Sequence, residues 1–212
     1  MVKQSGIIHI VPKTESWRVS DVLYRGETKN YELVGEMTSA MPQDKLVARY
    51  GLEIPSVPLI WAIASRAYDF RNENIEEVGS LRDFLRNGFR QFPNTSSKVI
   101  YNPSGFDKVI HNHGTSDQYS LNANVVGPND WIENILDKSV LESLLGTNDI
   151  NRINKVSNWI NETDTYLWRL NSKPSKKDER VVGFSAYSDG LGLSAAWDPL
   201  DEYPAFRVLQ VE

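Results

Sequence analysis

The spacing of apolar residues changes along this 212-residue chain, and the order of the changes limits which folds it can adopt. Strand-type apolar runs occupy both ends of the chain, at 7–11, 19–25, 31–36, 181–187, 191–197 and 205–211. Strands and helices do not alternate regularly between these ends, which favours an α+β fold over a doubly wound parallel sheet. We therefore predict a single domain, residues 1–212, whose mixed or antiparallel sheet is formed by N- and C-terminal strands.

The interior of the chain predicts about five helices packed against that sheet. Apolar residues recur at three- and four-residue steps over 42–51, 56–67, 75–92, 129–145 and 147–160. The second of these segments opens with Ser56 and Pro58, which suit a helix N-terminus. From Leu59 to Ala67 it is apolar nearly all round, so we expect it to be the central buried helix.

Two β-hairpins are also predicted. Residues 107–112 and 118–126 are strand-like and flank a polar loop, which indicates a hairpin near 107–126. The second hairpin joins 181–187 to 191–197 through Ser188-Asp189-Gly190. The segment 171–179, which precedes the second hairpin, is polar and rich in lysine, so we expect it to be an exposed connector.

Composition excludes several classes of function. The chain has no cysteine, which excludes disulfide scaffolds, thiolate zinc sites, iron–sulfur clusters and cysteine nucleophiles. Its formal net charge of −5 disfavours nucleic-acid binding, which depends on clustered Lys and Arg. Arg82, Arg86 and Arg90 are spaced along one helix face, but acidic neighbours indicate a solvated surface. No apolar run is long enough for a secretory signal or a membrane span, so we expect a soluble, cytoplasmic protein that does not bind membranes.

His111-Asn112-His113 is the sharpest local pattern. Alternate residues of a strand point to one face, so both imidazoles could bind one transition metal, with Asp117 as a third ligand. His9 would join such a site only if its strand paired near His111. The alternative is a polar hairpin tip whose His113 and Asp117 face water.

A second constellation runs through the whole chain. The order Arg25, Ser185 or Ser188, then Glu202 resembles the layout of arginine-type ADP-ribosyltransferases. That resemblance implies that Arg25 holds dinucleotide phosphates, a serine orients the substrate and Glu202 polarises the ribose. Two departures stand out: the serine segment is Ser-Ala-Tyr-Ser and not Ser-Thr-Ser, and Leu200 stands where the family has an acidic or amide residue. Tyr24-Arg25-Gly26-Glu27 is also similar to the start of FRG domains.

Two further catalytic patterns are missing from the sequence. No glycine-rich phosphate loop and no Gly-x-Ser-x-Gly elbow occurs. We therefore predict a non-catalytic binding or interaction protein, with a protein or small molecule as its ligand and no cofactor. The alternatives are a metal-dependent enzyme that uses the His111/His113 pair and an ADP-ribosyltransferase-like enzyme that uses Arg25 and Glu202. Whether Arg25 is structural, paired with Glu27 or Glu36, stays open at this point.

Overall fold

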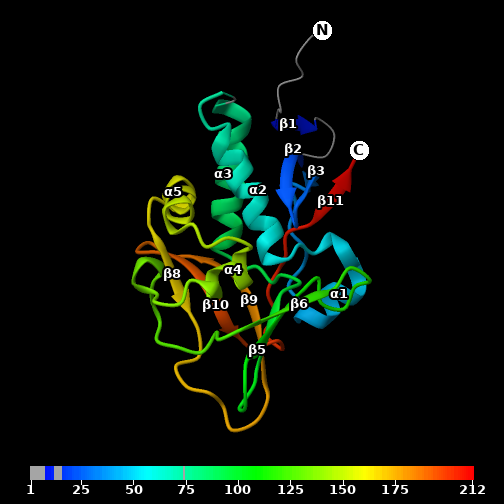
Figure 1. Ribbon diagram of the computed structural model, residues 1–212. Helices are drawn as coiled ribbons and strands as arrows, with labels where there is room; N and C mark the ends of the chain where they lie inside the picture. Colours follow the sequence, from blue (N-terminus) through cyan, green and yellow to red (C-terminus); the bar gives the residue numbers. More distant parts are fainter. Residues whose placement is uncertain (1–7, 12–15, 74) are drawn as a thin grey trace.

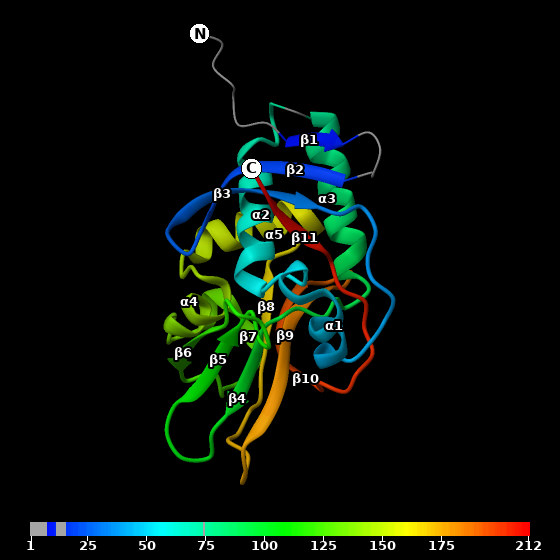
Figure 2. The same cartoon turned by 90° about the vertical axis from the view of Figure 1, so that its right-hand side faces the viewer.

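Two β-sheets with helices packed between and beside them make up the molecule (Figures 1 and 2). The computed structural model describes residues 8–11, 16–73 and 75–212. Within these ranges there are five α-helices: α1 (Gln43–Tyr50), α2 (Val57–Asp69), α3 (Ile75–Phe89), α4 (Ser139–Leu145) and α5 (Ile150–Asn161). The α+β prediction is confirmed.

The smaller sheet joins the two ends of the chain. Its strand order is β1 (Ile8–Val11), β2 (Ser16–Tyr24), β3 (Glu27–Leu33) and β11 (Val208–Val211), all antiparallel. The predicted pairing of N- and C-terminal strands occurs here, because Val208 of β11 lies opposite Leu33 of β3. Figure 2 shows this sheet at one end of the molecule.

The larger sheet has seven strands, in the order β6-β5-β4-β9-β10-β8-β7. They are β4 (Lys98–Tyr101), β5 (Asp107–His111), β6 (Tyr119–Ala123), β7 (Asp130–Trp131), β8 (Thr165–Trp168), β9 (Asp178–Ala186) and β10 (Leu191–Trp197). Only β8 and β10 pair in parallel. Both predicted hairpins are present, as β5–β6 and β9–β10.

Helix α2 is the central buried helix, as its apolar composition predicts. It packs against β2 of the smaller sheet and β9 of the larger one, and it also contacts α3, α4 and α5. Its Trp61 is 5% exposed and stacks on Phe184 of β9, with ring centroids 6.2 Å apart. One continuous cluster of buried apolar side chains therefore links both sheets through α2.

The packing of α3 depends on one glycine. The Phe206 ring lies against Gly88, where an added Cβ would come within 2.1 Å of Phe206 Cζ. Phe206 cannot easily move away, because it is 1% exposed and packs edge-on against Phe84 and Phe89. The helix therefore approaches the C-terminal segment closely only because residue 88 has no side chain.

The helix predicted over 129–145 is wrong in its first half. Asp130 and Trp131 instead form the short strand β7 against β8, and a single 3₁₀ turn follows at Ile132–Asn134. Leu136, which we expected on the apolar face, is fully exposed, and α4 begins only at Ser139. Pairing with β8 satisfies the backbone here in place of a helix. The predicted connector is also shorter than expected, since β9 begins at Asp178.

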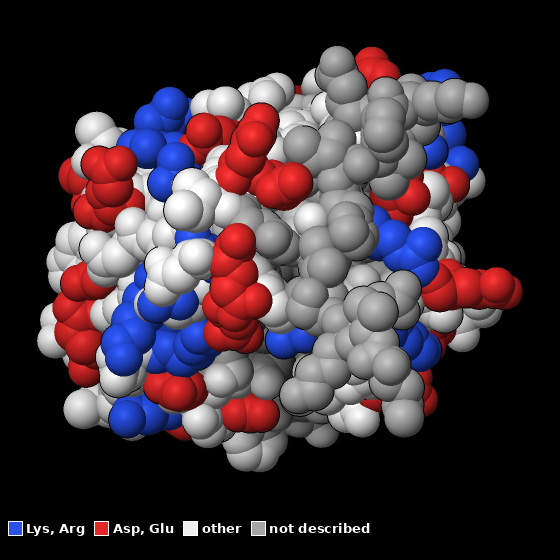
Figure 3. Space-filling view, turned by 90° about the horizontal axis from the view of Figure 1, so that it is seen from above, with Lys and Arg blue, Asp and Glu red and all other residues white. Residues whose placement is uncertain are grey.

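The distribution of charge and the length of the apolar helices bear on the expectations drawn from composition. Acidic and basic side chains are interspersed on the face seen in Figure 3. Among the described residues, no single helix is long and apolar enough to cross a membrane; one bent pair, Gln43–Glu53 with Val57–Asp69, meets that test by length and composition.

Candidate ligand-binding cavity

A cavity of about 680 Å³ lies beside α2, lined by residues from β2, α2, β6, α4 and α5. Its volume falls in the range of small-molecule binding sites. Apolar side chains form much of the lining: Leu23, Pro58, Trp61, Ala62, Leu121 and Leu145. Leu23 and Leu121 are exposed at this cavity although they are large and apolar, which is typical of a surface that contacts a ligand.

Arg25 reaches the cavity from a tight turn between β2 and β3. Tyr24 pairs with Glu27, so Arg25 and Gly26 are the only two residues of the hairpin loop. Both have a positive φ, 54° for Arg25 and 77° for Gly26. A two-residue loop with two positive φ values is the type I′ geometry, whose first position usually holds Asn, Asp or Gly. An arginine there is conformationally costly, and such strain is concentrated at functional sites.

The Arg25 side chain is held on one side by the β5–β6 hairpin. Its Nη1 donates to Asp117 Oδ1 and Oδ2, at 2.9 and 2.8 Å, and its guanidinium lies 4.3 Å from the Tyr119 ring centroid. Hydrogen bonding to Asp117 raises the pKa of Arg25, so the group is a permanent cation. Of the described residues, none accepts a hydrogen bond from its Nε or Nη2 atoms, which leaves these donors for a ligand. Neither Glu27 nor Glu36 pairs with Arg25; Glu27 binds Lys29.

Two further arginines line the cavity, and each is paired with a carboxylate. Arg66 donates to Ser20 O and lies 3.5 Å from Asp21. Arg152 of α5 donates to Asp69 of α2 at 2.7 Å and also to Ser65. The Arg152 contacts join α5 to α2, so we assign this arginine a structural role in the cavity wall.

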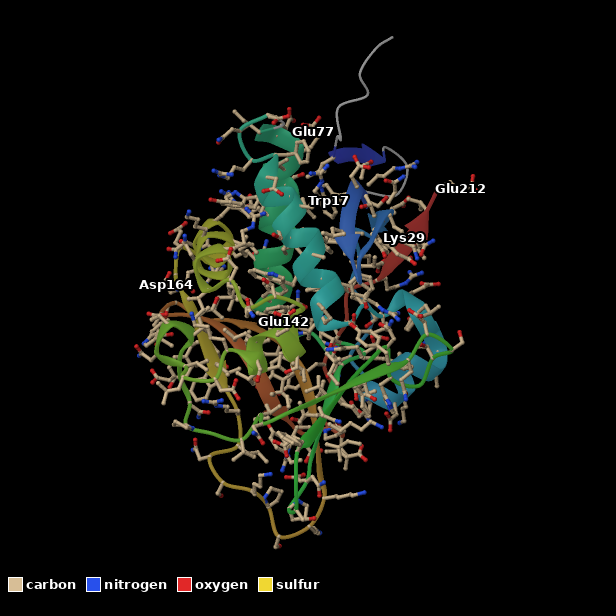
Figure 4. The ribbon with its side chains drawn as sticks, in the orientation of Figure 1. Trp17, Lys29, Glu77, Glu142, Asp164 and Glu212 are labelled. Carbon is tan, nitrogen blue, oxygen red and sulfur yellow. The ribbon has the colours of Figure 1, made fainter. Side chains whose placement is uncertain are left out.

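Glu142 is the remaining carboxylate of the cavity. It projects from α4, and Figure 4 labels it near the end of α2. No side chain or backbone group of the described ranges makes a hydrogen bond or an ion pair with its carboxylate. The cavity therefore combines a cation with free donors and a carboxylate with free acceptor sites.

Hydrogen bonds of Tyr24 and Tyr119 connect the surroundings of Arg25 to the start of α2. The Tyr24 hydroxyl lies 2.9 Å from Ser56 Oγ at the start of α2. Burial raises the pKa of Tyr119, and a hydrogen bond with Tyr24 raises it further, so the phenol stays protonated. Ser56 occupies the predicted N-cap position, but its hydroxyl faces Tyr24; Ser97 Oγ accepts from the Val57 amide instead.

The structure separates the two histidines of the His111-Asn112-His113 pattern. Strand β5 ends at His111, and Asn112 has a φ of 51°, so the chain turns before His113. His111 is buried and its two ring nitrogens lie 2.7 Å from Ser97 Oγ and 2.8 Å from Ser143 O. Because Ser143 O only accepts, His111 Nε2 donates to it and Nδ1 accepts from Ser97. His111 thus links α4 to Ser97, the residue that accepts from the first amide of α2, and both helices line the cavity.

His113 and Asp117 have other partners. His113 Nε2 lies 3.3 Å from Asp44 of α1, and Asp117 binds Arg25 and Asn112. The part of the chain that the structure describes holds no group of three or more His, Asp or Glu side chains placed to bind a metal. The His9 side chain lies outside the described residues; its strand pairs with β2 and belongs to the smaller sheet. Metal binding stays a prediction.

The Arg25–Glu202 constellation is not brought together around the cavity. Glu202 is exposed in the segment between β10 and β11, and Ser185 is buried in β9; neither residue is among those that line the cavity with Arg25. The sequence pattern thus singled out Arg25 and missed Glu142, which belongs to an ordinary amphipathic helix. Only the fold reveals that α4 faces the β2–β3 turn.

No protein-family model matches this chain, and no curated protein or solved structure was found to be similar to it.

Proposed function

We propose that this protein binds a small nucleotide-class ligand, with phosphate, hydroxyl and planar apolar groups, in the cavity beside α2. The observation that carries the proposal is Arg25: it adopts a costly turn conformation and presents unused guanidinium donors at the cavity. A guanidinium recognises phosphate through several donors in a fixed geometry.

The remaining cavity lining supports the same ligand class. Ribose hydroxyls can donate to the Glu142 carboxylate, which has free acceptor sites. The exposed apolar residues Leu23 and Leu121 offer surface to a planar base. A ligand with only negative groups would be repelled by Glu142, whereas a nucleotide offers groups that suit both Arg25 and Glu142.

Calorimetric titration with ADP and with NAD tests the proposal. We expect saturable binding of at least one of them, with weaker binding to the Arg25→Asn variant. Arg82→Asn provides the matched control, because Arg82 is equally exposed on α3 and does not line the cavity. Absence of saturable binding of both nucleotides would contradict the proposal.

Transfer chemistry on a nicotinamide dinucleotide is a second candidate, favoured by the unpaired Glu142 in the same cavity as Arg25. In this hypothesis Arg25 holds the phosphates and Glu142, in place of Glu202, stabilises positive charge that develops on the ribose. Water would attack the ribose as the bond to nicotinamide breaks, giving nicotinamide, ADP-ribose and a proton. Glu142→Gln should stop nicotinamide release while NAD binding remains; no release by the unmutated protein would contradict this candidate.

Two earlier expectations remain proposals. A metal-dependent reaction at His111 and His113 is tested by elemental analysis of purified protein. A cytoplasmic location is tested by fractionating cells that express the chain.

A further inference from the structure

Aromatic side chains line a second, smaller cavity of about 230 Å³. It lies at β7, β8 and the β9–β10 turn, toward the β7 edge of the seven-stranded sheet. Four aromatic residues line it: Trp131, Tyr166, Trp168 and Tyr187. Trp168 and Tyr187 are 42% and 45% exposed, so their rings are open to solvent although they are large and apolar. None of these residues lines the cavity that contains Arg25.

The strand register builds this aromatic cavity. Tyr166 and Trp168 alternate along β8, so they lie on one face of the sheet. Trp131 of β7 lies directly opposite Tyr166. The Trp131 and Tyr166 rings are 5.3 Å apart at 89°, and the Tyr166 and Trp168 rings are 4.9 Å apart at 54°. Rings at such angles form a corner, whereas a flat stack would leave no enclosed space.

One glycine, Gly192, leaves room for the Trp168 ring. A Cβ at Gly192 would come within 2.4 Å of Ser185 Oγ and 3.2 Å of the Trp168 ring, so the indole packs directly on the β10 backbone. A Cβ at Gly190 would lie 3.5 Å from the edge of the Trp131 ring, an ordinary van der Waals contact. The β9–β10 turn that carries Tyr187 is closed by a hydrogen bond from the Tyr187 amide to Gly190 O.

Charge decides the class of ligand. Asp189 is the one charged residue among the described residues that line this cavity. Aromatic faces attract cations through their quadrupoles, and an adjacent carboxylate adds to that attraction. The volume is below that of a typical drug-sized site, which suits a single compact head group. We infer that this aromatic cavity binds a quaternary ammonium group, as found on choline or on trimethylated lysine.

The inference is tested with choline and with its neutral isostere, 3,3-dimethyl-1-butanol, which has the same shape and no charge. Indole N–H signals of Trp131 and Trp168 are followed by NMR, assigned from single Trp→Phe variants. We expect saturable shifts with choline and at least about tenfold weaker binding of the isostere. Parallel titrations with trimethyl-lysine and unmodified lysine identify the source: tighter binding of choline indicates a small molecule, and tighter binding of trimethyl-lysine indicates a methylated protein.

Variants locate the site. Trp168→Ala and Asp189→Asn should each weaken choline binding about tenfold or more, while Trp159→Phe, a tryptophan of α5 outside the cavity, should leave it unchanged. Thermal melting checks that each variant is folded, and Asp189→Asn, an exposed isosteric change, keeps the test valid if Trp168→Ala does not fold. Equal binding of choline and its isostere, or no saturation by about 50 mM choline, would overturn the inference. So would unchanged choline binding by folded Asp189→Asn and Trp168→Ala.

Discussion

Replacing Arg25 by Asn separates the conformation of the β2–β3 turn from the charge that it presents. Asn tolerates a left-handed backbone better than any other residue except glycine, so the variant retains the φ of 54° that the turn requires. It removes the guanidinium and with it the contacts to Asp117 and Tyr119. Relief of the backbone strain should raise the free energy of unfolding, whereas loss of the guanidinium contacts should lower it. For ligand binding, only the loss of the guanidinium matters.

The expected change in unfolding free energy is small. The Arg25 and Asp117 side chains are 40% and 50% exposed, so their ion pair contributes at most about 1 kcal/mol. The cation–π contact with Tyr119 adds about 0.5–1 kcal/mol at such an exposed site. Relief of the left-handed strain returns about 1 kcal/mol. We therefore expect a net change within about 1 kcal/mol, measured by urea unfolding.

The expected change in affinity is larger. Each hydrogen bond between a guanidinium and an anion contributes about 1.5–3 kcal/mol, so loss of even one weakens nucleotide binding about tenfold or more. Calorimetric titration of Arg25→Asn with ADP or NAD measures this loss. Arg25→Lys keeps the charge without the forked donors and should lie between the parent and Arg25→Asn.

Two results would refute the reasoning. Unchanged affinity in Arg25→Asn would show that the ligand does not contact this side chain. A loss of stability of several kcal/mol would show that Arg25 is a structural residue that holds the β5–β6 hairpin. Arg82→Asn, whose side chain is 38% exposed beside Asp83, controls for the general loss of one surface charge.

Three further predictions concern the fold. Trp61→Ala should cost about 3–5 kcal/mol, because Trp61 is buried in α2, and a loss below about 1 kcal/mol in urea unfolding would contradict this packing. Gly88→Ala should destabilise the fold by about 1–3 kcal/mol through the clash with Phe206. Gly79→Ala in the same helix has nothing near its Cβ, so it should be neutral or stabilise the fold by up to about 1 kcal/mol. Similar melting temperatures for the two variants would count against the close packing. Burial lowers the pKa of His111 to about 4, from an ordinary value of 6.5, so the unfolded state binds more protons between these values and stability falls as the pH drops through that window. This loss should reach about 3 kcal/mol by pH 4, and His111→Gln should lose correspondingly less than the parent.

The local pattern of residues determined most of the elements. The apolar face of residues 59–67 predicts the buried helix α2, and the spacing of Val78, Leu81 and Leu85 predicts α3. Ser188-Asp189-Gly190 predicts the turn between β9 and β10. These features depend on residues close together in the chain, where side-chain period and turn chemistry suffice.

Pairings between distant segments were decided only in the tertiary structure. Strand β8 has four residues and no distinctive period, and it exists because β7 and β10 pair with it from either side. The separation of His111 from His113 follows from the turn at Asn112 and from burial against Ser143 of α4. Local periodicity contains no information on such partners, because they depend on which remote surfaces are buried together.

The candidate sites follow the same division. The sequence singles out Arg25 as a residue between a strand and a glycine, but its partner Asp117 lies 92 positions further along the chain. Glu142 and the four aromatic residues of the smaller cavity have no local signature at all. They become sites only when α4 packs beside α2 and when β7, β8 and β10 align, because a cavity is a property of surfaces that meet in space and not of any one segment.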